Sequence, residues 1–323
     1  MDFFQIIDDI AKVDPEVYHR FDSRRAAFRN FLGFGKKVTA SALPLAVGTL
    51  FNKAYGQAAA LPQIVVDTLN LALQLEYLEF FYYDTALNST GLLTAEQTQA
   101  FTIIRNDEQL HINTLRATLG ASAIAPLTRA SFDYTGSQNR TRPALFAPLG
   151  GTATPTTGTF SDQAVFLTVA QNFVDTGVRA YKGGAPNLNT ATTKDILEVA
   201  LNIHSVEARH SSRIRSFRRG GIQGTGAVKS WITPDETTNA APLPNNGVPN
   251  APTAVSPYLA GNPAANFPAE NNTLQGTPPA NVQTIAPGVS ATAGAEAFDE
   301  PLDAATVKAI AKNFAANPAA LFN

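Results

Sequence analysis

Apolar residues fill almost the whole stretch from about Leu61 to Leu87, a pattern typical of a helix buried inside a helical bundle. Its middle part, Leu73 to Tyr83, nevertheless carries two carboxylates, Glu76 and Glu79, which stand three residues apart and therefore lie on one face of that helix. A carboxylate on an apolar face is costly unless it is paired, protonated or bound to a cation. The pattern therefore predicts that partners for these carboxylates lie elsewhere in the chain.

Three more helices are predicted downstream. The second opens at Thr94, which begins a capping box with Gln97, and ends at Gly120. The third is expected to stop at Gly183 and Gly184. Residues 121–161, rich in Gly, Thr and Pro, are too many for a tight turn and fit a crossover between two helical hairpins. The sequence thus predicts an all-α, antiparallel four-helix bundle over residues 61–221, with helices at about 61–87, 94–120, 162–182 and 193–218.

Two Glu-x-x-His motifs lie in the second and fourth predicted helices, at Glu108 to His111 and at Glu207 to His210. Residues i and i+3 of a helix project side by side, so each motif presents one carboxylate and one imidazole towards one point. The chain has no cysteine, which leaves carboxylate and imidazole as the candidate metal ligands. With the helix that carries Glu76, the motifs predict a metal site inside the bundle.

The two predicted hairpins are imperfect copies of each other. Glu108 follows Glu76 by 32 positions (108 − 76), and Glu207 follows Val174 by 33 (207 − 174). A tyrosine stands seven positions after Glu76 and after Val174, at Tyr83 and Tyr181. Matching registers make a chance origin of the two motifs less plausible than for a single one.

Several segments carry a resemblance to one family: Leu75–Glu79, Asp107–His111, Asp175–Tyr181, Glu207–His210 and the tail segments that begin at Gly288 and Glu296. Over about Leu61 to Leu302 the chain resembles the ferritin-like family, in the group that includes the plant desiccation-related protein. The resemblance implies a four-helix bundle that holds two iron or manganese ions. It also implies that the tyrosines orient carboxylates, and that the ligands are Glu76, Glu108, His111, Glu207 and His210.

One ligand of that pattern is missing, because Val174 stands where the second hairpin should supply a glutamate. Asp175 is rotated by about 100° around the helix and is expected to point elsewhere. His204, three residues before Glu207, offers a further nitrogen, and Glu79 is either an alternative to Glu76 or the partner of a buried cation. The prediction is a lopsided site with iron or manganese at partial occupancy or absent. A metal-free core of glutamates paired with histidines is the alternative.

Residues 1–60 have two interpretations. Arg24 and Arg25 resemble the twin arginine of an export signal, and a modest apolar run from Val38 to Phe51 follows. This predicts the periplasm or cell envelope as the location. The alternative is an uncleaved, helical N-terminal arm in the cytoplasm, since Phe3, Ile6 and Ile10 have helical spacing.

Residues 222–323 are predicted to form a Pro-, Asn- and Ala-rich, mostly irregular extension that covers the bundle, with Trp231 and Phe267 as anchors. A terminal helix at about Asp303 to Ala316 has one apolar face and is expected to dock on its own bundle or on a neighbouring chain. The arm and the extension predict a homo-oligomer. Four arginines near the end of the fourth helix are interpreted as favourable charges at a helix C-terminus and not as a binding patch: Arg213, Arg215, Arg218 and Arg219.

The formal net charge of -2 argues against a nucleic-acid partner, and no apolar run reaches the roughly 20 residues that span a bilayer. Three functions stay open: an active di-metal oxidase or peroxide-detoxifying enzyme, a metal-binding stress-protective protein, and an envelope protein that assembles through a metal-free bundle. The motifs favour the second, with weak or absent oxidase activity because of Val174.

Overall fold

The structure is a computed structural model, and it describes residues 61–150, 158–237 and 256–323. The predicted arm or export signal, residues 1–60, lies outside the described residues. The bundle and the C-terminal region belong to one compact unit, Ala59–Asn323.

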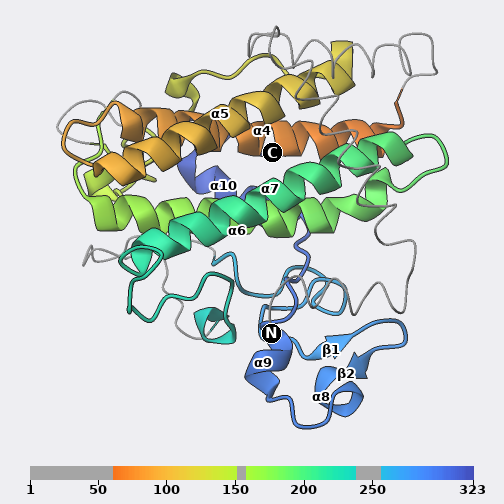
Figure 1. Cartoon of the computed structure of the whole chain (residues 1–323). Coiled ribbons are helices and arrows are strands. Elements are labelled where there is room, and N and C mark those ends of the chain that lie inside the picture. Colours follow the sequence, from red (N-terminus) through yellow and green to blue (C-terminus); the bar gives the residue numbers. More distant parts are fainter. Residues whose placement is uncertain (1–60, 151–157, 238–255) are drawn as a thin grey trace, which may run out of the picture. The chain divides into compact units, whose positions relative to one another are not determined.

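Four long helices run side by side and form the bundle (Figure 1). Helix α4 pairs with α5, helix α6 pairs with α7, and α4 also packs on α6. Short connections join the members of each pair, whereas residues 120–162 join α5 to α6. The predicted all-α bundle with a long crossover is confirmed, with helices α4 (Gln63–Leu87), α5 (Ala95–Leu119), α6 (Gln163–Leu188) and α7 (Lys194–Arg218).

The ends of the helices follow local sequence rules with one exception. Thr94 and Gln97 form the predicted capping box of α5, and Gly120 ends that helix with a positive φ of 54°. The predicted end of α6 at Gly183 is wrong, because the helix continues to Leu188. A Cβ at Gly183 would overlap the backbone carbonyl of Leu302. Gly183 therefore serves close packing of the C-terminal segment, Gly184 serves close packing against Thr68 of α4, and neither ends the helix.

The crossover and the C-terminal segment pair with each other on the outside of the bundle. Phe132 forms an isolated antiparallel bridge with Ala315, and the Asp133 N–H donates to the Phe314 carbonyl at 2.8 Å. The hydroxyl of the buried Tyr134 donates to the Leu78 carbonyl of α4 at 2.7 Å. These contacts fix the crossover on the hairpin that carries Glu76.

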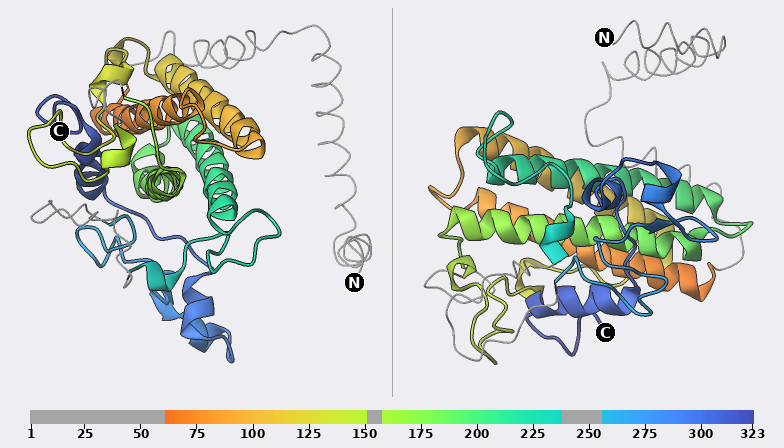
Figure 2. Two further views of the ribbon diagram at one scale, coloured as in Figure 1. Left: turned by 90° about the vertical axis from the view of Figure 1, so that its left-hand side faces the viewer. Right: turned by 90° about the horizontal axis from the view of Figure 1, so that it is seen from below.

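The C-terminal region is mostly irregular, as predicted, with a small antiparallel sheet and short helices (Figure 2). The last helix, α10, packs on α4 and α6 of its own bundle. The elements are β1 (Leu274–Gln275), β2 (Ala280–Asn281), α8 (Val282–Ile285), α9 (Ala291–Ala295) and α10 (Ala304–Ala311).

Two buried arginines connect the C-terminal region to the bundle. Arg179 on α6 pairs with Glu270 at 2.7 Å and donates to several backbone carbonyls of residues 257–301. Arg215 on α7 is 1% exposed and pairs with Asp175 of α6, so the interpretation as a simple helix-end charge is wrong. Trp231 is 49% exposed and is not the expected anchor.

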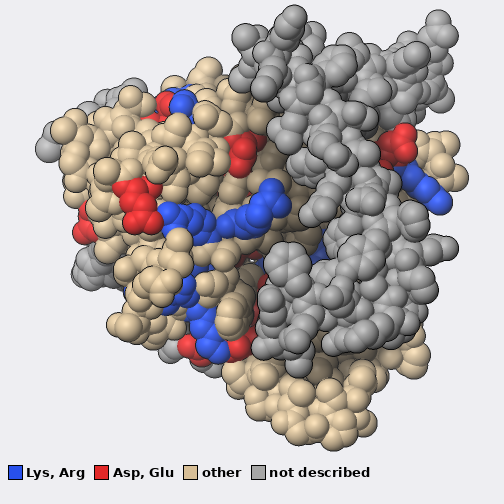
Figure 3. Space-filling model, in the orientation of Figure 1, with Lys and Arg blue, Asp and Glu red and all other residues tan. Residues whose placement is uncertain are grey.

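The described surface carries mixed charge. On the face drawn in Figure 3, Lys and Arg lie among Asp and Glu, and uncharged residues cover most of the described surface. Among the described helices, none combines the length and apolar character needed to cross a membrane.

Candidate metal centre

Three helices bring carboxylates and imidazoles together in the middle of the bundle. Glu76 comes from α4, Glu108 and His111 from α5, and Glu207 from α7, all of them buried. One ligand atom from each of these four residues lies within 4.8 Å of the others. This buried cluster of acidic and imidazole groups has the composition and spacing to hold a metal ion.

His210 extends the cluster on the other side of Glu108. Its Nδ1 atom lies 3.1 Å from Glu108 Oε1 and 3.9 Å from Glu207 Oε2. The Nδ1 atom of His111 lies 3.1 Å from Glu108 Oε2 and 3.4 Å from Glu207 Oε1. Each of these two glutamates therefore turns one oxygen to each histidine. That division is what a carboxylate needs in order to bridge two cations.

Several polar atoms of the cluster have no hydrogen-bond partner although they are buried. They are Glu108 Oε1, both carboxylate oxygens of Glu207, and His210 Nδ1. Glu108 Oε1 and His210 Nδ1 are close enough for a hydrogen bond, but their angles do not form one. Buried polar groups in native proteins are nearly always hydrogen-bonded. Buried oxygen and nitrogen atoms that converge without hydrogen-bonding one another are arranged as ligands for a cation between them.

Glu79 supplies a further carboxylate from α4. It is 4% exposed. Burial, followed by the negative charges of Glu207, Glu108 and Glu76, raises its pKa well above the ordinary value. A Cβ added at Gly177 would lie 3.5 Å from Glu79 Oε1 and 3.4 Å from Glu207 Oε2. Both carboxylates therefore face the same bare stretch of α6 backbone.

The register explains this arrangement. Val174 and Gly177 on α6 correspond in the internal repeat to Glu76 and Glu79 on α4. Val174 is fully buried and offers no ligand, and Gly177 has no side chain to fill the space beside it. The α6 face of the cluster is therefore without donor groups at both positions, and the extra carboxylate comes from α4.

Two tyrosines hold the α4 carboxylates. The Tyr83 hydroxyl donates to Glu79 Oε2 at 2.8 Å, one turn along the same helix. The Tyr181 hydroxyl on α6 donates to Glu76 Oε1. Burial, followed by the nearby glutamate, raises the pKa of each phenol well above its ordinary value. Both phenols therefore stay protonated and act as donors to the carboxylates.

The structure adds one residue to the predicted set and leaves one outside it. Asp107 Oδ2 lies 3.1 Å from His210 Nε2 and fixes the orientation of that ring. The only sequence signal was its position directly before Glu108. His204 is half-buried, and burial lowers its pKa below the ordinary value, with only partial opposition from Asp299. It is not part of the convergent group. Asp175 points to Ser211 and Arg215, away from the cluster, as expected.

Charges inside the cluster balance one another. Burial alone would lower the pKa of His111 and His210, but the surrounding carboxylates outweigh it and raise both well above the ordinary value. Burial alone would raise the pKa of Glu108. The charges and hydrogen bonds of His210 and His111 outweigh burial, and the pKa of Glu108 is lowered. Burial raises the pKa of Glu76 to about 8. Without a metal, the cluster therefore holds protons at neutral pH.

A pH dependence of metal affinity follows. Metal binding must displace the protons held by groups whose pKa values are raised, namely Glu76, Glu79, His111 and His210. We expect the affinity for Mn²⁺ to rise between about pH 6 and about pH 8, with release of protons on binding. Calorimetric titration in buffers of different ionisation enthalpy measures that release. An affinity that stays constant over this range would contradict displacement of protons.

Comparison with known proteins agrees with this geometry. Residues 64–219 match the family model described as the ferritin-like domain. The matched range begins in α4 and ends just after α7, so it covers the whole bundle and every residue of the cluster. No curated protein and no solved structure was found to match the sequence. The chain therefore carries a ferritin-like domain over residues 64–219, with a buried glutamate and histidine cluster suited to a metal ion.

Proposed function

We propose that this protein binds about two iron or manganese ions per chain between the helices of its ferritin-like domain. The orientation of the carboxylates of Glu108 and Glu207 supports the proposal. Glu108 and Glu207 each turn one oxygen to His111 and the other to His210. Such a pair of bridging carboxylates keeps two cations close together and offsets their mutual repulsion.

The remaining ligands divide between the two positions. Glu76 lies 3.0 Å from His111 Nδ1 and completes the first position. Glu79 Oε1 faces Gly177, as does Glu207 Oε2, the oxygen on the His210 side, and Glu79 would complete the second position. In this arrangement Glu79 takes the place of the glutamate that Val174 cannot supply. Each cation would then be held by one imidazole, one carboxylate of α4 and the two carboxylates of Glu108 and Glu207.

The donor set fits iron or manganese. Carboxylates with one imidazole per cation suit these metals, and the described residues include no thiolate, since the chain has no cysteine. Iron or manganese held in this way supplies redox chemistry towards O₂ or peroxide. Because α6 contributes no ligand, we propose weak or absent oxidase activity and a protective role through metal binding. Export to the periplasm or cell envelope stays a prediction, which the mass of the mature protein tests.

Elemental analysis of the protein as isolated, and again after anaerobic loading with Fe²⁺ or Mn²⁺, tests the proposal. We expect about two ions per chain. Content near zero after loading with both metals would contradict it, and would favour the metal-free bundle whose function lies in the extensions. Oxygen consumption by the iron-loaded protein then separates the storage role from an active oxidase.

The role of Glu79 has a test of its own. The Glu79→Gln variant keeps an acceptor for Tyr83 but loses a charged ligand, so we expect metal content to fall from about two ions to about one. Adding Val174→Glu to this variant returns a carboxylate to the cluster from α6. We expect the double variant to recover the second ion by elemental analysis.

The matched control is Glu198→Gln, a substitution on the exposed side of α7. It changes the same charge without touching the cluster, so metal content should equal that of the parent. If Glu79→Gln binds as much metal as this control, Glu79 is not a ligand, even though the other positions can still be right.

A further inference from the structure

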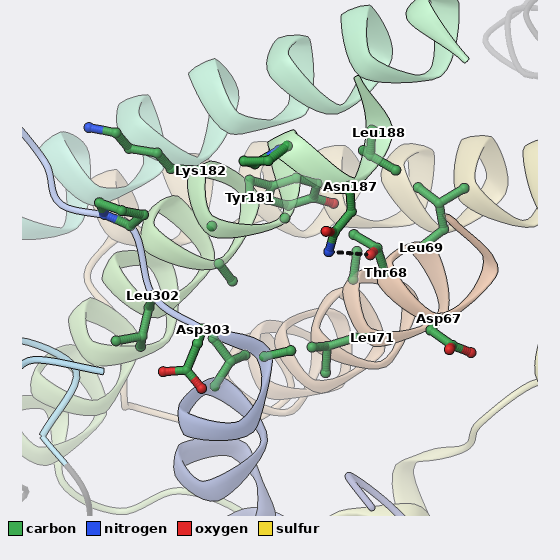
Figure 4. Close-up of a pocket in the computed structure, with 18 of the residues that line it drawn as sticks. Asp67, Thr68, Leu69, Leu71, Tyr181, Lys182, Asn187, Leu188, Leu302 and Asp303 are labelled. Atoms are coloured by element: carbon green, nitrogen blue, oxygen red, sulfur yellow. Dashed lines mark hydrogen bonds between the residues drawn. The ribbon is translucent and has the colours of Figure 1, made fainter. Parts of the chain in front are cut away.

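A cavity of about 680 Å³ lies between α4, α6 and the C-terminal segment (Figure 4). Its walls are mostly apolar, with Leu71 and Ala72 on α4, Gly183 on α6, and Leu302 and Val307 on the C-terminal side. Small-molecule sites in proteins commonly enclose about 300 to 1,000 Å³. The size and lining therefore match a site for an organic molecule.

The cavity is long. Along α4 its lining extends from Ile64 to Leu75. Eleven residues of helix, at a rise of about 1.5 Å each, correspond to roughly 16 Å. Gly183 and Gly184 contribute no side chains on the α6 wall, and α10 closes the opposite side. An extended chain fits this shape better than a compact ring system does.

The charged residues on the walls balance one another, two lysines against two aspartates, and each already makes a hydrogen bond within the protein. Lys182 donates to the Asp299 carbonyl, and Lys308 donates to the Asn323 carbonyl. Asp303 caps α10 and accepts from the Thr306 N–H at 3.0 Å. Asp67 accepts from the Gln63 side chain at 2.7 Å. A charged ligand would therefore lose its hydration and meet walls whose charges of the two signs are equal in number.

One wall of the cavity is shared with the metal centre. The ring of Tyr181 lines the cavity, while its hydroxyl donates to Glu76. Leu75, the neighbour of Glu76 in the chain, lines the cavity as well. A molecule in the cavity would thus lie one aromatic ring away from a carboxylate of the cluster.

We propose that this cavity binds an uncharged molecule with a long aliphatic chain, of the fatty-alcohol class. The balanced wall charges favour an uncharged head group, and the length along α4 accommodates an extended chain. Binding itself needs no metal. Only the contact with Glu76 through Tyr181 rests on the proposed metal-binding function.

The test uses the full-length, metal-free protein and the uncharged fluorescent probe N-phenyl-1-naphthylamine. We expect saturable probe binding and displacement by dodecan-1-ol, with dodecanoate about tenfold weaker as a competitor. Equal or better competition by dodecanoate would overturn the assignment of an uncharged ligand. Absence of saturable binding would overturn the site itself, whatever the metal content of the protein.

Two variants place the ligand in the cavity. Ala72→Phe on the α4 wall and Ala180→Leu on the α6 wall each fill part of the space, and each should weaken displacement by dodecan-1-ol about tenfold. The control is Ala164→Phe, an exposed position near the start of α6. Circular dichroism verifies that each variant is folded. If either folded cavity variant binds dodecan-1-ol as the control does, the ligand lies elsewhere.

Discussion

The Glu108→Gln variant is expected to lose nearly all of its bound metal. Glu108 is fully buried and is the one carboxylate within 3.1 Å of both histidines of the cluster. Glutamine keeps the size of the side chain but removes the charge that both proposed cations share. We therefore expect metal affinity to fall by more than about 100-fold, beyond the loss typical of residues that only orient a ligand.

Elemental analysis after anaerobic loading measures this effect, and Glu96→Gln is its control. Glu96 lies on the same helix, but its side chain is 60% exposed and pairs with Arg213 at 2.8 Å. The control should bind metal as the parent does. Circular dichroism shows whether the bundle has formed in both variants. A folded Glu108→Gln protein with parental metal content would refute the bridging role of Glu108.

The Arg179→Met variant is expected to lower the free energy of unfolding by about 3 to 5 kcal/mol. The guanidinium is fully buried, pairs with Glu270 and donates to five backbone carbonyls in three short segments of the C-terminal region. Methionine fills a similar volume but leaves these acceptors without a donor. The substitution also removes the positive charge of Arg179, which favours the ionised form of Glu270. Burial disfavours that form and already raises the pKa of Glu270 to about 8.

Urea unfolding of the metal-free protein measures the loss. The control is Arg105→Met, which breaks the surface pair of Arg105 with Asp84, where the side chains are 29% and 38% exposed. That change should cost less than about 1 kcal/mol. Equal effects of the two substitutions would mean that Arg179 does not hold the C-terminal region in place.

The bundle and the convergence of the motifs were predictable from the sequence because both depend on local spacing. Helical periodicity, the capping box at Thr94 and the i, i+3 geometry of Glu108 and His111 need no knowledge of distant residues. The internal repeat then indicated which helices carry equivalent positions. It also indicated that Val174 breaks the pattern, and the structure places Val174 beside the cluster without a donor group.

The features that sequence reasoning missed all depend on contacts between distant segments. Gly183 appeared to be a helix end because the backbone of Leu302, which packs against it, is far away in the sequence. Arg215 appeared to be a helix-end charge because its partner Asp175 lies on another helix. The space beside Gly177, which Glu79 and Glu207 face, likewise appears only when α4, α6 and α7 are packed together.

The contact between Phe322 and α4 spans most of the described sequence. Phe322 is buried, and its N–H donates to Gln74 on α4 at 3.0 Å, across 248 positions of sequence. Contacts of such long range form slowly compared with the local contacts of a helical hairpin. On the ribosome, α4 and α5 emerge long before Phe322 does. The hairpins are therefore expected to form first, and α10 and Phe322 are expected to complete the outer wall of the bundle afterwards.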